Sequence, residues 1–490
     1  MMPWRVQDST APFGKTPGTS SNHWRWLAAG LASGLASGSV PRTLAPEERL
    51  ASDFPRAMEL QITRGPGGRI VTNIGAWSPD SEWVLYDTRS GAAGAIFDGD
   101  SIEMVSVRTG EVRQLYRSTA GAYCGAATFS PREGRVVFMH GPEHPTPDWS
   151  YGFWHRRGVM VDTAQPGVGI TVDACDITPP FTPGALRGGS HVHVWDATGD
   201  WLSFTYEDHV LAQFSVVSAT HDINQRNVGV SIPGRPVRVE KDHRRNHDGA
   251  FFTVLVTRTT ANPRPGSDEI SRACEEGWVG TNGYIRADGT RQRRALAFQG
   301  SVMTLSGGSI AEVFVVDLPE DLTQPGMGPL AGTETRAPYP PRGATQRRLT
   351  FTANRQFPGI QGPRHWLRCS PDGSRIAFLM KDGAGVVQLW TVSPTGGEPR
   401  QLTRNPFPIA SSFTWSPDGQ WIVHAMDNSL CLTDTKSGST ARLTPRSSDE
   451  LAPRPEACVF APDGRKIAFV RRLPAGAESF NQIHVFFLQP

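Results

Sequence analysis

Histidine is the residue type through which this 490-residue chain is best equipped to do chemistry. Of its 13 histidines, eleven lie between residues 140 and 424, mostly beside turns or at the starts of expected strands. His191 and His193 are two residues apart, so on a strand their side chains share one face. Neutral imidazoles that converge from different segments are what a divalent metal ion requires. His191, His193 and His365 are therefore candidate metal ligands, although a single histidine near a strand start more often hydrogen-bonds within its own protein.

The segments that carry these histidines follow a repeat. Seven stretches share an aromatic or small anchor residue, a turn of the Ser-Pro-Asp-Gly type and an alternating apolar segment. Proline and glycine suit the two corners of a hairpin turn, and the alternation is typical of a half-buried strand. The copy at residue 250 lacks the turn. The anchors are Trp77, Phe129, Trp195, Ala250, Cys369, Trp415 and Phe460.

The spacing of the anchors predicts an all-β fold, a β-propeller of seven four-stranded blades within residues 58–490. The last three anchors are 46 and 45 residues apart, which is enough for one four-stranded sheet each. Six or eight blades stay open, because residues 260–368 contain either a long insertion or a weak blade. Triplets of the Gln-Leu-Thr type end the repeats, and one of them, at residues 61–63, precedes the first anchor. We therefore expect this triplet to complete the last blade and close the ring.

The repeat also gives the histidines a common register. Four residues before each anchor the chain enters its innermost strand, where the blades meet the central channel. His191 and His365 occupy this same position in two different blades. The residues at this position are Asn73, Gly125, His191, His365, Ser411 and Glu456.

Residues 58–490 resemble the TolB-like propeller repeat, which serves binding scaffolds, peptidase gates and lyases alike. More closely, the chain is similar to the bacterial YidR family, a resemblance that implies the fold and brings no reaction with it. The matching stretches are residues 72–75, 140–144, 154–158, 186–194, 265–270, 276–280 and 363–366.

Three short windows are similar to oligogalacturonate lyases, seven-bladed propellers that hold manganese in the channel and use a histidine as base. They are residues 138–143, 190–195 and 363–366. The resemblance implies that His140 is the base and that His191, His193 and His365 hold Mn²⁺. Gln361 lies near the position of the lyases' glutamine ligand, with a spacing shifted by one. Where the lyases have two histidines in the last window, this chain has only His365.

Such a site would perform β-elimination on a uronate. A cation neutralises the C6 carboxylate and so acidifies the C5 proton, which a base of near-neutral pKa removes. His243 or His247 is a candidate additional ligand. Arg156, Arg157 or Arg187 would hold a substrate carboxylate, the alternative for each being a surface ion pair.

We therefore expect a metal-dependent enzyme that acts on small acidic saccharides. The alternative is a non-catalytic propeller that binds a protein or peptide partner. The net charge is only +2 with scattered Lys and Arg, which argues against nucleic acid as a partner. The sequence contains no Gly-x-Ser-x-Gly motif and no phosphate loop, which argues against a serine peptidase or a nucleotide-binding enzyme.

Residues 1–57 differ from the rest in being rich in Ser, Gly, Ala and Pro, without a strand pattern. We expect a dispensable leader, with Met58 as the possible true start, and a cytoplasmic protein. The alternative is export, with residues 1–38 as a signal peptide. The six cysteines show no CxxC pairing and are expected to be free thiols. No segment is apolar over the length that a membrane helix needs.

Overall fold

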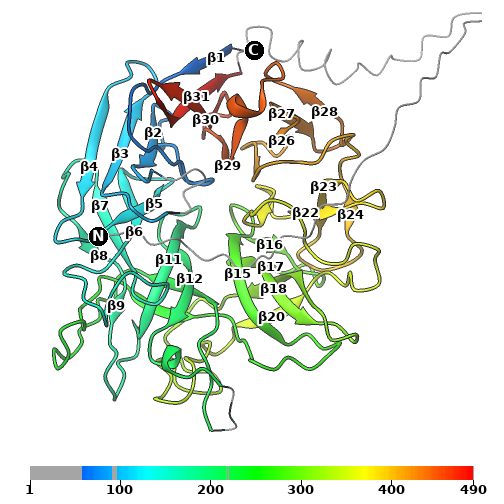
Figure 1. Ribbon diagram of the computed structural model, residues 1–490. Coiled ribbons are helices and arrows are strands. Elements are labelled where there is room, and N and C mark those ends of the chain that lie inside the picture. The colour runs from blue at the N-terminus through cyan, green and yellow to red at the C-terminus, as the bar shows by residue number, and fades with distance from the viewer. Residues whose placement is uncertain (1–57, 91–95, 217, 219, 489–490) are drawn as a thin grey trace, which may run out of the picture.

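A computed structural model describes residues 58–90, 96–216, 218 and 220–488, and it has a ring of seven sheets around a central channel (Figure 1). The expected all-β, seven-bladed propeller is confirmed. The segment expected to be a leader, residues 1–57, lies outside the described residues. Two single-turn 3₁₀ helices, η2 (Leu211–Gln213) and η3 (Asp449–Leu451), are the helical elements within the described part. It contains no helix long and apolar enough to span a bilayer.

The blades are numbered here in chain order, each from its channel-lining strand outward. Blade 1 consists of β2 (Trp83–Asp87), β3 (Ser101–Ser106) and β4 (Val112–Arg117), with residues 70–77 bridged to β2 on the channel side. Blade 2 consists of β5 (Cys124–Phe129), β6 (Arg135–His140), β7 (Arg157–Asp162) and β8 (Ile170–Thr171). Blade 3 consists of β11 (Gly188–Trp195), β12 (Leu202–Asp208), β13 (Asn227–Ile232) and β14 (Phe252–Leu255). Blade 4 consists of β15 (Ile270–Trp278), β18 (Ala295–Met303), β19 (Ser309–Asp317) and β20 (Thr345–Arg348).

Apart from β1, the strands of the remaining blades come from the last quarter of the chain. Blade 5 consists of β21 (Arg368–Cys369), β22 (Ile376–Lys381), β23 (Val387–Val392) and β24 (Arg400–Gln401). Blade 6 consists of β25 (Thr414–Trp415), β26 (Trp421–Met426), β27 (Ser429–Asp434) and β28 (Thr440–Arg442). Blade 7 consists of β29 (Pro453–Phe460), β30 (Lys466–Ala475), β31 (Glu478–Phe487) and β1 (Met58–Gln61). Two small ribbons, β9 (Ala174–Cys175) with β10 (Ala185–Leu186) and β16 (Tyr284–Ile285) with β17 (Arg291–Gln292), lie outside the blades.

Two tryptophan anchors of the repeat, and Trp278 in blade 4, link neighbouring blades. The indole Nε1 of Trp415 donates to the carbonyl of Arg368 at 3.0 Å, and that of Trp77 donates to Val459 at 3.0 Å. Trp278 does the same toward Val194 of the preceding blade, at 3.0 Å. A buried indole needs an acceptor, and here the acceptor is the innermost strand of the preceding blade.

The polar residues of the repeat satisfy backbone groups at the turns and at the outer edges. In the turn of blade 6 the Ser416 hydroxyl contacts Asp418 and accepts the N–H of Trp421 at 2.9 Å, which closes the hairpin. The threonine that ends each triplet accepts a strand N–H, as Thr403 does from Leu389 at 3.0 Å. These side chains satisfy backbone groups that the sheet ladder leaves unpaired.

The ring is closed by the N-terminal strand, as the sequence predicted. Strand β1 pairs antiparallel with β31, with Met58 opposite Phe487. Thr63 accepts the N–H of Ile483 at 2.8 Å, so the first triplet ends the last blade just as the other triplets end theirs.

One anchor was assigned to the wrong strand. Residues 252–255 form β14, the outermost strand of blade 3, so Ala250 does not begin a blade. The channel-lining strand of the next blade is β15, and the complete four-stranded blade 4 lies between residues 270 and 348. Its hairpins lack the Ser-Pro-Asp-Gly turn, which explains why the repeat is weak there.

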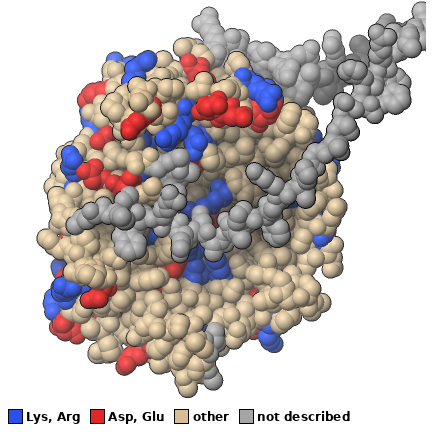
Figure 2. All heavy atoms as spheres, in the orientation of Figure 1, with Lys and Arg blue, Asp and Glu red and all other residues tan. Residues whose placement is uncertain are grey.

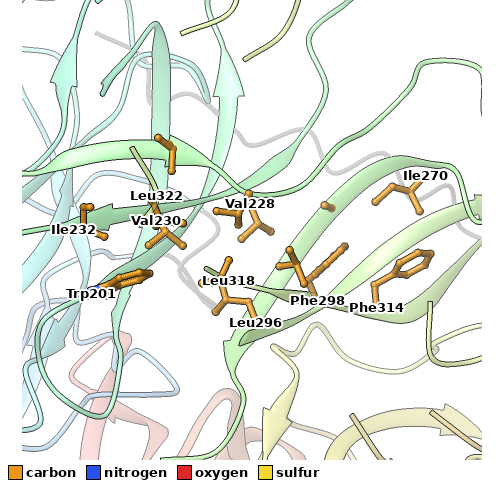
Figure 3. Packing of buried hydrophobic residues seen from close by; sticks show 14 of the residues in the cluster. Trp201, Val228, Val230, Ile232, Ile270, Leu296, Phe298, Phe314, Leu318 and Leu322 are labelled. Carbon is orange, nitrogen blue, oxygen red and sulfur yellow. The ribbon is translucent and has the colours of Figure 1, made fainter. Parts of the chain in front are cut away.

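The core lies between the blades. Between blades 3 and 4, Val228 and Val230 of β13 face Leu296, Phe298 and Phe314 of β18 and β19 (Figure 3). Trp201 belongs to the same cluster (Figure 3). Because the core occupies the faces between sheets, the starts of the innermost strands are left to line the channel.

Candidate functional site

The channel end at which the innermost strands begin collects cationic side chains around His191. His191 projects from β11 of blade 3 and Arg156 directly precedes β7 of blade 2. Arg364 precedes β21 of blade 5. Figure 2 shows Lys and Arg side chains gathered at the centre of the molecule, around its central hollow. These residues form one positively charged group, here called the channel cluster. It consists of His191, Arg156 and Arg364, together with Arg226, Glu207 and Glu275, which lie beside them.

The hydrogen bonds of His191 fix its tautomer. Arg156 Nη1 lies 2.6 Å from His191 Nδ1, and a guanidinium can only donate, so Nδ1 accepts. Burial, followed by the charges of Arg156 and Arg364, holds the pKa of His191 well below its usual value, so the ring is neutral. The one proton of a neutral imidazole must then be on Nε2.

Arg364 Nη2 lies 3.5 Å from this Nε2. Two N–H groups therefore face each other across the channel cluster. Two donors in this arrangement gain nothing from one another, whereas one acceptor placed near both would satisfy them together. A carboxylate is such an acceptor.

The channel cluster contains more guanidinium charge than its carboxylates balance. Arg364 Nε pairs with Glu275 at 2.9 Å, and Arg226 Nη2 pairs with Glu207 at 2.6 Å. Arg156 differs, because among the described residues no carboxylate lies within ion-pair distance of it. Arg156 is 4% exposed, its guanidinium packs on Tyr151 and Phe153, and its Nε has no hydrogen-bond partner among the described residues.

A buried guanidinium without a carboxylate is costly unless an anion compensates it. Burial lowers the pKa of Arg156, because removing the charged guanidinium from water disfavours its protonated form. The channel cluster is therefore organised to receive an anionic group.

His193 and His365, the other two expected metal ligands, are used elsewhere. His193 is fully buried between blades 2 and 3, where its Nε2 lies 3.2 Å from Asp173 and its ring packs on Phe204. Gly158 makes the room, since a Cβ there would lie 2.6 Å from His193 Nε2. A bulge at Val192, with φ of +52°, interrupts the register between His191 and Val194, so the expected common face is lost.

His365 has a structural task. Its Nδ1 donates to Pro363 O at 2.9 Å, and its Nε2 accepts the N–H of Leu379 at 3.1 Å. In blade 6 the hydroxyl of Ser411, which occupies the equivalent position, accepts the N–H of Ala425 at 2.7 Å. The equivalence read from the repeat therefore describes a backbone hydrogen bond.

His140, the expected base, is also fully engaged. It is fully buried at the end of β6, where its Nδ1 donates to Gly141 O at 2.7 Å and its Nε2 accepts from Tyr116 at 3.1 Å. Burial and the charge of Arg157 lower its pKa to about 4. In this arrangement it presents no lone pair to a ligand.

Arg187, Gln361 and His243 lie apart from the channel cluster. Arg187 is 1% exposed and joins Asp208, at 2.7 Å, to the carbonyls of Thr333 and Arg336. Gln361 bonds Pro358 O at 2.7 Å, and His243 accepts the N–H of Arg245 at 3.2 Å. Of the expected site residues, the structure brings Arg156 and His191 together at the channel, and Arg156, Arg157 and His247 line one adjoining cavity.

The residues present do not fit a manganese ion. Among the described residues no three His, Cys, Asp or Glu side chains are grouped so that they could hold a metal. His191 presents an N–H beside two guanidinium groups, and these would repel a divalent cation. The expected ligand set is not assembled here.

Sequence reasoning missed Arg364, Arg226 and Glu275. Arg364 directly precedes His365, so the register that placed His365 at the channel also placed its neighbour there. Glu275 lies in β15, the strand for which the repeat offers no turn signal. It has a φ of +52°, a conformation that no sequence pattern indicated.

Comparison with known proteins finds similar sequences. Residues 123–247 match a family described as protein of unknown function (DUF3748). The chain is 46% identical over 419 residues to the uncharacterised protein YidR of Escherichia coli K12, covering 85% of this chain and 95% of that protein.

Two solved structures of oligogalacturonate lyase share the architecture. One is in complex with manganese, with a TM-score of 0.51 and 13% identity, covering 88% of this chain and 93% of the other. The second, from Vibrio parahaemolyticus, gives a TM-score of 0.51 at 12% identity, covering 88% and 94%. At these identities the likeness establishes the propeller fold.

Proposed function

This chain belongs to the YidR family, and we propose that it binds an acidic saccharide of the uronate type at the channel cluster. The Escherichia coli member is itself described as uncharacterised, so the function has to be inferred from this chain's own side chains. The observation that supports this most is the donor pair of Arg364 and His191 beside the uncompensated Arg156. A carboxylate would accept from all three.

The guanidinium groups would do the work that a metal does in a lyase. β-Elimination needs the carboxylate next to the acidic carbon neutralised, and paired arginines supply positive charge with bidentate geometry. In this proposal the substrate class expected from the sequence is kept, while Mn²⁺ is replaced by Arg156 and Arg364.

Glu275 is the proposed base. Burial opposes its ionised form, but the charge of Arg364 and other nearby groups outweighs burial and holds its pKa below the usual value. A bound carboxylate would take Arg364 as partner, and Glu275 would lose the charge that stabilises its ionised form, which makes it a stronger base. It would then accept the C5 proton while the C4–O bond breaks, a C4–C5 double bond forms and water protonates the leaving oxygen.

The first experiment is calorimetric binding of a digalacturonide and of its neutral disaccharide analogue to the full-length protein. We expect the acidic ligand to bind and the neutral one not to bind. Arg364→Gln removes one charged donor, which is worth about 1.5–3 kcal/mol, so affinity should fall about ten- to a hundredfold. Arg108→Gln is the matched control, because Arg108 is exposed in the turn between β3 and β4.

Three outcomes separate the parts of the proposal. Unchanged affinity in Arg364→Gln would remove the channel cluster as the binding site. Affinity that disappears in EDTA and returns with Mn²⁺ would restore the metal-dependent alternative. Glu275→Gln should keep binding and lose the absorbance of unsaturated product by about 10²–10⁴-fold, the usual effect of a general base.

A further inference from the structure

A second cationic site lies beside Arg156. Here the connection between β6 and β7 (residues 141–156) and residues 244–247 enclose a cavity of ≈ 200 Å³. Arg156 lines this cavity and donates to His191, so the cavity adjoins the channel cluster. Its other principal wall residues are Arg157, Arg244, Arg245, His247, Trp149 and Glu143.

The cavity has four guanidinium groups and one carboxylate in its wall. Arg157 Nη2 pairs with Glu143 at 2.9 Å, while Arg245 is held by the backbone carbonyls of Glu143 and His144, at 2.7 and 3.0 Å. The buried Nε atoms of Arg156, Arg157 and Arg245 have no hydrogen-bond partner within the described part of the chain. Unpaired buried donors of like charge favour an oxyanion.

His247 adds an acceptor to these donors. Its Nδ1 lies 3.1 Å from the carbonyl of Arg245, which can only accept, so the proton is on Nδ1. Nε2 then carries the lone pair, and this atom is buried without a partner among the described residues. Burial, followed by the charge of Arg157, lowers the pKa of His247, which keeps the lone pair available.

A single hydrogen-bond acceptor among guanidinium donors distinguishes oxyanions that carry a hydrogen from those that do not. Sulfate has no hydrogen and would place an oxygen against the His247 lone pair. A protonated phosphate offers an O–H to the same atom and oxygens to the arginines. We propose that this cavity is a phosphate site, which takes inorganic phosphate or the phosphate of a sugar ester in its protonated, singly charged form.

The site is one of binding rather than group transfer. Its cysteine, Cys175, is buried, and burial raises the pKa of the thiol to about 12, so it remains unionised. One face of Trp149 is stacked on His155 at 3.8 Å and the Arg245 guanidinium lies 5.4 Å from its ring, so Trp149 serves to position Arg245. The cavity shares Arg156 with the channel cluster, so the variants that test the proposal substitute residues that belong to only one of the two sites.

The test is titration of the full-length protein with inorganic phosphate and with sulfate, below the second pKa of phosphate. We expect phosphate to bind at least tenfold more tightly than sulfate. His247→Leu removes the acceptor, so it should abolish this preference while an anion still binds. Equal affinity for the two anions in the unsubstituted protein would overturn the proposal.

Two further variants test the cationic wall. Arg157→Gln should weaken phosphate binding at least tenfold, whereas Glu143→Gln should tighten it, because it removes the competing carboxylate. Tightening cannot arise from a folding defect, so unchanged or weaker binding in Glu143→Gln would contradict the proposal. Arg364→Gln affects the channel cluster and should leave phosphate binding intact. Comparing the affinities for galactose 1-phosphate and for inorganic phosphate then shows whether the site takes a sugar ester or free phosphate.

Discussion

At the scale of single residues, the same position can serve the backbone in one blade and a ligand in another. The residues four positions before the anchors include His191, His365 and Ser411. His365 and Ser411 accept N–H groups of the neighbouring strand, whereas His191 contacts Arg156 and Arg364. The role of each histidine therefore depends on its burial and its hydrogen-bond partners as well as on its position in the repeat.

His365→Ala should destabilise the protein without changing ligand binding. The substitution leaves the buried N–H of Leu379 without an acceptor, at a cost of about 1–3 kcal/mol in the free energy of unfolding. Denaturant unfolding measures this cost. Ser411→Ala is the matched control and should cost a similar amount, because it removes the equivalent bond to Ala425. A His365→Ala variant of unchanged stability that loses saccharide affinity would show that His365 belongs to the binding site.

The sequence predicted the fold far better than the site, and the reason is physical. Hairpin turns and alternation are local, so the Ser-Pro-Asp-Gly copies show most blades directly. The channel cluster depends instead on where long arginine side chains find partners across blades. The bulge at Val192 separated His193 from His191, and Glu275 adopted an unusual backbone conformation. Neither leaves a signature in residue type.

At the scale of elements, the ring is held closed by one short strand. Glu59 in β1 accepts from Arg471 of β30, with Nε–Oε1 and Nη2–Oε2 distances of 2.8 and 3.0 Å. Its Oε1 also lies 2.6 Å from His484 Nδ1 of β31. Four residues of β1 are therefore tied to two strands from the other end of the chain.

Glu59→Gln should loosen this closure in a pH-dependent way. Burial opposes ionisation of Glu59, but its bonds to His484 and Arg471 outweigh it and lower the pKa to about 2. A lowered carboxyl pKa stabilises the fold above the unfolded value of 4.5, and the gain is lost as pH falls toward 2. The stability difference between the two proteins should therefore be largest near neutral pH and shrink below about pH 4.5, as measured by urea unfolding. A difference that grows on acidification would contradict this assignment.

At the scale of the whole molecule, the propeller begins at the strand that closes it. Strand β1 starts at Met58, and Thr63 ends the blade by accepting the N–H of Ile483. All seven blades are built from residues 58–487. A chain that starts at Met58 therefore contains every strand that the ring needs.

A protein that starts at Met58 should unfold at the same urea concentration as the full-length chain and bind the acidic saccharide and phosphate with the same affinities. A protein that starts at Arg64 lacks β1 and Thr63. It leaves the edge of β31 unpaired and Arg471 without Glu59, so it should unfold at markedly lower urea and expose an aggregation-prone strand edge. Equal stability of the two shortened proteins would mean that β1 does not hold the ring closed. Loss of binding in the protein that starts at Met58, relative to the full-length chain, would place part of the ligand site in residues 1–57.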